Sequence, residues 1–277
     1  MKPQDKLNEI ISKMIEKIET GEAGSWIKPW KTGLPQNFST KKTYKGFNVF
    51  SLWITAEEMG YKTNNWLTFN QVKAMGGNVK QGEQATPVFF FKPLEIKEED
   101  EAGNETVKTI PMLKIYNVFN LDQTTLEINS DNVVIPEIED FVTNTGANIK
   151  TAQKAYFSPF EDYIGMPDLH LFESEEHYYS TLLHELSHWT GHSSRLDRLN
   201  LSKNLKAYAY EELIAETTSA LLNAFLGVDY SKMQHEAYLA SWLEALKAEP
   251  KMLWKVCSQA QEAFDFLMNL QEQKKVA

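Results

Sequence analysis

The chain has 277 residues, of which 42% are hydrophobic, and a formal net charge of −10 at pH 7. This composition excludes a disordered tail, and the length allows one large domain or two modest ones. No stretch approaches the roughly 18 apolar residues of a membrane span, and the charged N-terminus lacks the apolar region of a secretion signal. The single cysteine, Cys257, excludes an intramolecular disulfide. We therefore expect a globular protein of the reducing cytoplasm that does not enter a membrane.

The charge is distributed unevenly along the chain. Residues 1–92 contain 13 lysines and 8 acidic residues, a net charge of +5, whereas residues 93–277 carry a net charge of −15. A mildly basic part followed by a strongly acidic part indicates two different functions within one chain.

Helices are expected in the first third of the chain at three places. Residues 3–20 place apolar side chains at helical spacing along one face. A short helix is then stopped by Gly60, and another is expected from Thr68, a potential N-cap, to Met75.

A pair of strands is expected next. The apolar residues 86–91 predict a buried strand, and the β-rich residues 112–121 are expected to pair with it. The acidic residues 95–108 between them predict an exposed hairpin loop or a mobile excursion. Residues 122–136 lack strong periodicity and are expected to connect two parts of the chain.

Helical patterns dominate after about Pro136. We expect helices over 138–149, 174–191 and 207–227, short strands within 155–167, and two C-terminal helices divided near Pro250. The fold class predicted is α+β. A small N-terminal α+β domain spans residues 1–125, and a mainly helical domain spans residues 126–277.

The segment LLHELSHWTGH, residues 182–192, contains three of the six histidines. His184 and His188 are four residues apart, so a helix places both imidazoles on one face, as two ligands of one zinc ion require. Glu185 follows the first histidine and can act as general base towards a metal-bound water. This HExxH pattern predicts a zinc peptidase, with the peptide substrate lying along a strand near Tyr163–Pro167.

A third protein ligand is needed for such a site. The longer pattern HExxHxxGxxH would place a histidine where the chain has Ser194, so that class of peptidase is disfavoured. His192 remains a weaker alternative ligand. On the following helix we expect Glu212 as the third ligand, with Glu211 as its main rival. Glu216 lies one helical turn further on and is expected to accept the free N–H of a ligand histidine.

These motifs resemble a known family. HELSHWTGHSSRLDR followed by YAYEELIAE resembles the zincin-type metallopeptidase domain of ArdC-type antirestriction proteins of conjugative plasmids and integrative elements. WIKPW, PQNFSTKKTYKGFN and NNWLTFNQVKAMGGNVKQGE resemble that family's N-terminal domain. The resemblance implies that a single-stranded DNA-binding domain precedes the peptidase domain. It also implies that the two HExxH histidines and the EELIAE glutamate hold the metal.

The N-terminal residues by themselves are compatible with DNA binding. Residues 26–69 interleave aromatic side chains with lysines, a pattern typical of proteins that stack bases and neutralise phosphates. No arginine precedes Arg195, which favours contacts that are independent of DNA sequence. The residues we expect to contact single-stranded DNA are Trp26, Lys28, Trp30, Lys41, Lys42, Tyr44 and Lys45.

Two functions follow from these patterns. The first is a zinc peptidase that carries a DNA-binding domain. The alternative is a non-catalytic protein that coats incoming single-stranded DNA, in which zinc only stabilises the fold. A third, weaker possibility is an N-terminal domain that binds a protein partner instead of DNA.

Overall fold

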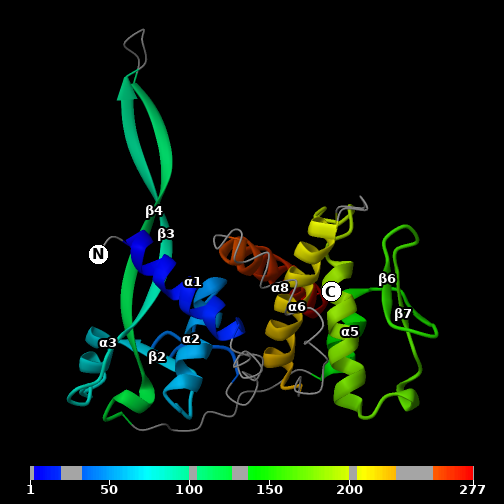
Figure 1. Cartoon of the computed structure of the whole chain (residues 1–277), viewed down its shortest axis with the longest axis horizontal. Coiled ribbons are helices and arrows are strands. Elements are labelled where there is room, and N and C mark those ends of the chain that lie inside the picture. Colours follow the sequence, from blue (N-terminus) through cyan, green and yellow to red (C-terminus); the bar gives the residue numbers. More distant parts are fainter. Residues whose placement is uncertain are drawn as a thin grey trace.

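The computed structural model of the chain describes residues 3–19, 33–99, 105–126, 137–199, 205–228 and 252–276. A four-stranded sheet with short helices forms the N-terminal half, and a three-stranded sheet beside long helices forms the second half (Figure 1). This arrangement confirms the predicted α+β class. In the described parts of the chain, no helix combines the length and the apolar character needed to cross a membrane.

The larger sheet has the strand order β1-β2-β4-β3. β1 (Gln36–Asn37) runs parallel to β2 (Asn65–Thr68), and the other neighbours are antiparallel. β3 (Thr86–Glu99) and β4 (Glu105–Asn120) pair along their whole length and project from the body of the molecule as a two-stranded arm (Figure 1). The predicted pairing of these strands is confirmed. Residues 95–99 and 105–108, where an exposed loop or excursion was predicted, belong to the two strands, because ladder pairing satisfies their backbone donors and acceptors.

The three helices predicted for this half are confirmed. α1 (Pro3–Glu19) buries one apolar face, and α2 (Phe47–Glu58) ends just before Gly60, which has a positive φ of 66°. α3 (Phe69–Ala74) begins at a capping box in which the Thr68 side chain accepts from the backbone N–H of Gln71.

The smaller sheet has the order β5-β7-β6. Before it, α4 (Ile138–Thr145) is shorter than predicted because Gly146 adopts a left-handed conformation, with φ of 72°, and ends the helix. The chain then forms β5 (Ile149–Thr151), β6 (Tyr156–Ser158) and β7 (Tyr163–Met166). β7 is the central strand, parallel to β5 and antiparallel to β6.

Long helices complete the second half. α5 (Glu175–Trp189) begins at Ser174, whose hydroxyl accepts from the backbone N–H of His177, as the sequence predicts. α6 (Leu205–Leu226) packs against both α5 and α8 (Met252–Val276). Pro250, where two C-terminal helices were expected to divide, lies outside the described residues.

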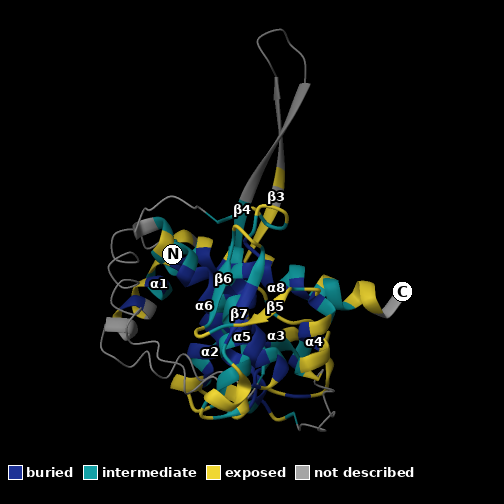
Figure 2. Ribbon diagram, turned by 90° about the vertical axis from the view of Figure 1, so that its right-hand side faces the viewer, coloured by how far each residue is buried: buried dark blue, intermediate teal, exposed yellow. Residues whose placement is uncertain are grey.

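The two halves of the chain share one hydrophobic core. Its largest cluster joins side chains of α1, α2 and β3 to side chains of α5, α6 and α8, and the buried residues lie where these elements meet (Figure 2). The predicted boundary between two domains near residue 125 stays a prediction. The hydrophobic core contains side chains from both sides of that boundary. Representative members of this cluster are Ile11, Phe47, Phe89, Leu183, Leu222 and Leu267.

Candidate metal centre

The helix α5 places two imidazoles side by side. His184 and His188 are one turn apart, their ring centroids are 4.8 Å apart, and their ring planes are inclined by 82°. Their Nε2 atoms lie 3.2 Å from each other. Both rings therefore aim the same nitrogen at a common point, as their spacing predicts.

The helix α6 brings a carboxylate to that point. The Glu212 Oε2 lies 3.6 Å from His184 Nε2, and Oε1 lies 3.6 Å from His188 Nε2. The ligand atoms of the three residues all lie within 4.8 Å of one another. Glu212 is only 5% exposed, so its carboxylate has little contact with solvent and faces the two imidazole rings.

The three donor atoms fit a divalent metal ion. Tetrahedral zinc with Zn–N bonds of about 2.0–2.1 Å separates two ligand nitrogens by about 3.3–3.4 Å. The 3.2 Å between the two Nε2 atoms matches that separation. If each imidazole is neutral and carries its proton on Nδ1, both Nε2 atoms are hydrogen-bond acceptors, and their lone pairs repel each other at this distance. A metal cation bound between the two Nε2 atoms removes that repulsion.

Two further glutamates face the outer sides of the rings. Glu211 Oε1 lies 3.2 Å from His188 Nδ1, and Glu216 Oε1 lies 3.7 Å from His184 Nδ1. Glu211 is within hydrogen-bond distance of His188 Nδ1, and a carboxylate in this position orients a ligand imidazole and leaves its Nε2 free for a metal. Glu216 faces His184 Nδ1 at an ion-pair distance, longer than a hydrogen bond. Of the three candidate glutamates, Glu212 is the one that faces both Nε2 atoms.

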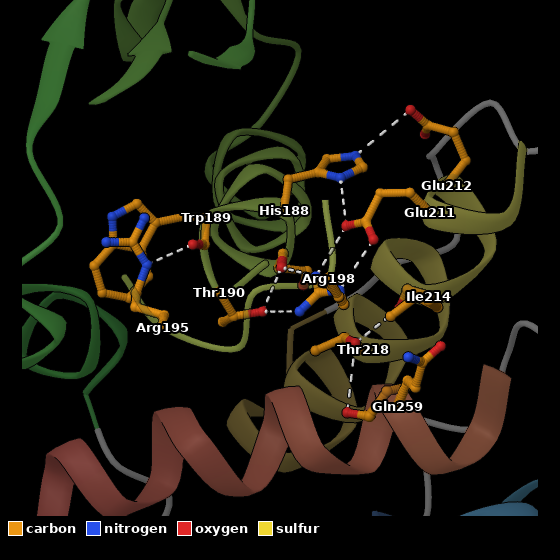
Figure 3. A network of polar contacts seen from close by, with 12 residues as sticks. His188, Trp189, Thr190, Arg195, Arg198, Glu211, Glu212, Ile214, Thr218 and Gln259 are labelled. Atoms are coloured by element: carbon orange, nitrogen blue, oxygen red, sulfur yellow. Dashed lines mark hydrogen bonds and ion pairs between the residues drawn. The ribbon is translucent and has the colours of Figure 1, made fainter. Parts of the chain in front are cut away.

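Arg198 holds Glu211 in place, and no sequence argument identified it. Its Nε and Nη2 donate to the Glu211 carboxylate at 3.0 and 2.9 Å, and Nη1 donates to Thr190 Oγ1 at 2.6 Å (Figure 3). Its Nη2 also donates to the backbone oxygen of Ser187 at 2.6 Å. The chain contains only two arginines, Arg195 and Arg198, and their position directly after the HExxH helix could have drawn attention to this network.

The carboxylates shift the ionisation of the cluster. Burial alone would lower the pKa of His184 and of His188, but contacts with glutamates outweigh it and raise both pKa values. Burial would also raise the pKa of Glu212, yet its contacts with the two histidines hold that pKa well below the usual range. The site therefore carries a concentrated negative potential that favours a cation.

The other residues singled out in the HExxH segment are not members of the described metal cluster. Glu185 is half-buried on α5, and its charge contributes to the raised pKa of His184. His192 contacts Ser194 Oγ through Nδ1 at 2.8 Å, and its ring packs edge-on against Phe157. His192 does not belong to the described metal cluster.

The expectation that a peptide substrate lies along a strand near Tyr163–Pro167 stays a prediction. β7, which spans Tyr163–Met166, is paired with β5 and β6 on both sides. A strand whose backbone groups are already paired on both edges has no donors or acceptors left for a peptide. Within the described sheet, the strands with an unpaired edge are β5 and β6.

The residues expected to contact DNA have different surroundings. Lys41 and Lys42 are exposed, and Tyr44 is half-buried against the core. Lys45 forms an ion pair with Asp265 of α8 at 2.7 Å. Trp26, Lys28 and Trp30 lie outside the described residues.

Comparisons with known proteins match both halves of the chain. Residues 136–259 match a family model described as a zincin-like metallopeptidase, and residues 4–119 match the N-terminal domain of anti-restriction factor ArdC. The fold is similar to the crystal structure of the antirestriction ArdC protein from the R388 plasmid in its metal-free form. That comparison gives a TM-score of 0.80 and 40% identity, and it covers 96% of this chain and 97% of the other.

A Mn(II)-bound structure of the same R388 protein is also similar, with a TM-score of 0.77 and 40% identity over 95% of this chain and 96% of the other. Together with the geometry of the cluster, this supports a divalent metal ion at the centre.

The curated relatives are either much longer than this chain or similar to it in length. Two Escherichia coli proteins named DNA primase TraC are 34% and 33% identical over 100% and 97% of this chain, but the chain spans only 21% and 27% of their lengths. The uncharacterized protein y4eC of Sinorhizobium fredii is 31% identical over 96% of this chain and 92% of its own length.

Proposed function

Because the chain belongs to the family of ArdC-type antirestriction proteins, we propose that it is a zinc-dependent peptidase of the cytoplasm that also binds single-stranded DNA. The observation that carries the peptidase proposal is the convergence of His184, His188 and Glu212, with Glu185 on the same helix. The plasmid origin of the R388 relative supports a role for this protein in a conjugative or integrative element.

His184, His188 and Glu212 would hold the metal ion. Two imidazole nitrogens and one carboxylate are a donor set that catalytic zinc sites commonly use, which supports the choice of zinc. A zinc ion bound there supplies a Lewis acid that polarises a carbonyl and lowers the pKa of water to about 7. Glu211 and Glu216 orient the two imidazoles through their Nδ1 atoms.

Glu185 is the proposed general base. It follows the first ligand histidine, so it lies close to the metal site without sharing the face that carries the two imidazoles. Its carboxylate accepts a proton from the attacking water and returns it to the leaving amine of the cleaved peptide.

The proposed peptide substrate binds beside β6. This strand has an unpaired edge in the described sheet and contacts the metal-bearing helix α5. An extended peptide can pair with such an edge through backbone hydrogen bonds, which brings its carbonyl groups towards the site.

The peptidase proposal is tested by measuring metal content and cleavage together. Native protein is analysed by mass spectrometry for bound metal, and cleavage of a peptide library and self-cleavage are then followed with added zinc. We expect Glu185→Gln to retain the metal but to lose cleavage by at least about 100-fold. Glu175→Gln, an exposed glutamate in the first turn of the same helix, is the control and should cleave normally.

A protein that retains zinc but shows no cleavage that depends on Glu185 would favour the second candidate, a non-catalytic protein that coats single-stranded DNA. The exposed lysines of the N-terminal half support DNA binding in either case. Protection of single-stranded DNA from nuclease digestion would then be equal for the native protein and Glu185→Gln.

A further inference from the structure

A cavity of about 800 Å³ lies where the N-terminal half meets α8. Its walls are the segment 37–48, the bases of β3 and β4, and the first half of α8. The volume falls within the range typical of ligand sites, and no residue of the metal cluster lines it.

Three exposed aromatic rings line this cavity, and two of them, Phe90 and Tyr116, pack against each other. Phe90 of β3 and Tyr116 of β4 are each 41% exposed, and Phe91 of β3 is 48% exposed. Val88 pairs directly with Tyr116 in the strand register, so Phe90, two residues further along, projects from the same face of the sheet as Tyr116. Their ring centroids lie 5.5 Å apart at an interplanar angle of 75°. The pair offers a broad apolar surface to a flat ligand.

Positive charges flank the two rings. Lys42 and Lys92 are exposed lysines that line the cavity, and Lys114 lies opposite Phe90 in the strand register. Lys45 and Asp265 also line it but neutralise each other in an ion pair. Glu262 is the remaining carboxylate in the lining, so the cavity has an excess of positive charge within a chain of net charge −10.

The helix α8 forms the opposite wall and is attached to the N-terminal half. The backbone N–H of Gly46 donates to Gln261 Oε1 at 2.9 Å, beside the ion pair between Lys45 and Asp265. Ser258 and Gln261 add polar groups that can hydrogen-bond to a ligand. The cavity therefore requires both halves of the chain.

The geometry disfavours an extended peptide as the occupant. A peptide would need the free edge of β3, but the Asn48 side chain occupies that edge at Phe89. Its Nδ2 donates to the Phe89 carbonyl at 2.7 Å, and its Oδ1 accepts from the Phe89 N–H at 2.8 Å. The Asn48 amide therefore makes the two backbone hydrogen bonds at Phe89 that a neighbouring strand or a bound peptide would otherwise make.

We propose that single-stranded nucleic acid binds in this cavity, with bases stacked on Phe90 and Tyr116 and phosphates held by Lys42 and Lys92. The assignment rests on the proposed DNA-binding function and gives that function a site. Aromatic platforms combined with cations are the elements that bind single strands without regard to sequence. No arginine lines the cavity, which fits contacts with phosphates in preference to base edges.

The proposal is tested with the full chain by fluorescence anisotropy, using a labelled oligothymidylate as the probe. We expect the double substitution Phe90→Ala and Tyr116→Ala to raise the Kd at least about 10-fold, because two stacking surfaces are lost. Phe160→Ala is the matched control, since Phe160 is 85% exposed and lies in the other half of the chain. Its Kd should equal that of the native protein.

Conservative variants separate stacking from loss of fold. Phe90→Tyr with Tyr116→Phe keeps both rings and should retain native affinity, while the alanine variant should keep the native unfolding temperature because both rings are exposed. Lys42→Ala with Lys92→Ala should make the salt dependence of the Kd shallower, by a slope of about 1.4 on logarithmic axes for two phosphate contacts. Glu262→Gln should strengthen binding.

The outcomes distinguish the site from the function. Native protein could bind oligothymidylate with a salt-dependent Kd while the alanine double variant binds equally well. In that case the cavity is not the binding site, and the protein binds DNA through another surface. If native protein does not bind the oligonucleotide at all, the DNA-binding function itself fails. A labelled neutral peptide that competes for the cavity would overturn the choice of occupant.

Discussion

Arg198 is the residue on which the outer part of the metal centre depends. Its side chain is 5% exposed and makes hydrogen bonds to Glu211, Thr190 and Ser187. Glu211 in turn contacts His188 Nδ1. A single guanidinium thus connects the end of α5 to α6 and fixes the orientation of one proposed metal ligand.

Replacing Arg198 by alanine should lower both stability and metal affinity. The substitution leaves the Glu211 carboxylate, which is 12% exposed, without its cation, so we expect a loss of about 3 kcal/mol in the free energy of unfolding. Metal affinity should fall about 10-fold because His188 is less well oriented. Urea denaturation and calorimetric zinc titration measure the two effects. Adding Glu211→Gln should recover part of the stability, and an unchanged unfolding midpoint in Arg198→Ala would contradict the assignment.

Asp162 provides a prediction about pH. Its carboxylate forms a two-pronged ion pair with Arg195, which holds the pKa of Asp162 below its ordinary value. A lowered pKa in the folded state contributes stability above the unfolded pKa of about 4, and this stability is lost as pH falls through the folded pKa. Because Asp162 is 38% exposed, the contribution is at most about 1 kcal/mol.

We therefore expect Asp162→Asn to be less stable than the native protein at pH 7 and equally stable near pH 2. Urea denaturation at pH 7, 4 and 2 measures the difference. Asp168→Asn, an exposed aspartate on the segment after β7, is the control. A difference that is independent of pH would mean that the charge of Asp162 contributes nothing.

At the scale of elements, the smaller sheet depends on close packing between β6 and β7. A Cβ on Gly165 of β7 would lie 2.6 Å from the ring of Tyr156, which β6 contributes. That ring cannot simply move away, because its hydroxyl lies 2.6 Å from the hydroxyl of Tyr163. The glycine is required here for space.

We expect Gly165→Ala to displace Tyr156 and lower the free energy of unfolding by about 1–3 kcal/mol. If β6 binds the substrate, peptide cleavage should fall as well. Thermal unfolding and the cleavage assay measure both effects. Combining Gly165→Ala with Tyr156→Ala removes the clash and should restore part of the stability lost through it, and equal stability of Gly165→Ala and native protein would show that the ring moves freely.

Local patterns predicted most elements because they depend on neighbours in the chain. Helical spacing identified the helices, and the cap Thr68 identified the start of one of them. The end of α4 was missed because Gly146 interrupts an apolar pattern that continues beyond it. The central position of β7 was also missed, since strand order depends on pairings between segments that no local pattern records.

At the scale of the whole molecule, the shared core couples the two halves. Side chains of α1, α2 and β3 belong to the same hydrophobic cluster as α5, which carries the proposed metal ligands. A metal ion that binds only the folded state should therefore stabilise both halves together.

We expect one thermal transition for the entire chain, shifted upward by zinc. Zinc at 100 times its Kd adds about 2.7 kcal/mol, which corresponds to a rise of roughly 5–10 °C for a domain of this size. Differential scanning calorimetry with and without chelator measures the shift. The triple variant His184→Ala, His188→Ala, Glu212→Ala should show no shift, whereas two transitions of which only one responds to zinc would mean that the halves unfold independently.

The sequence by itself determined that His184, His188 and Glu185 belong to one helix, because the periodicity of a helix is a local property of the chain. Only the tertiary structure distinguished Glu212 from Glu211 and Glu216, since the choice depends on how α6 is rotated against α5. The same holds for the cavity beside Phe90, whose walls come from strands and a helix far apart in sequence. Packing between segments that are distant in sequence determines which of these side chains meet. The residue pattern within one segment contains no information about that packing.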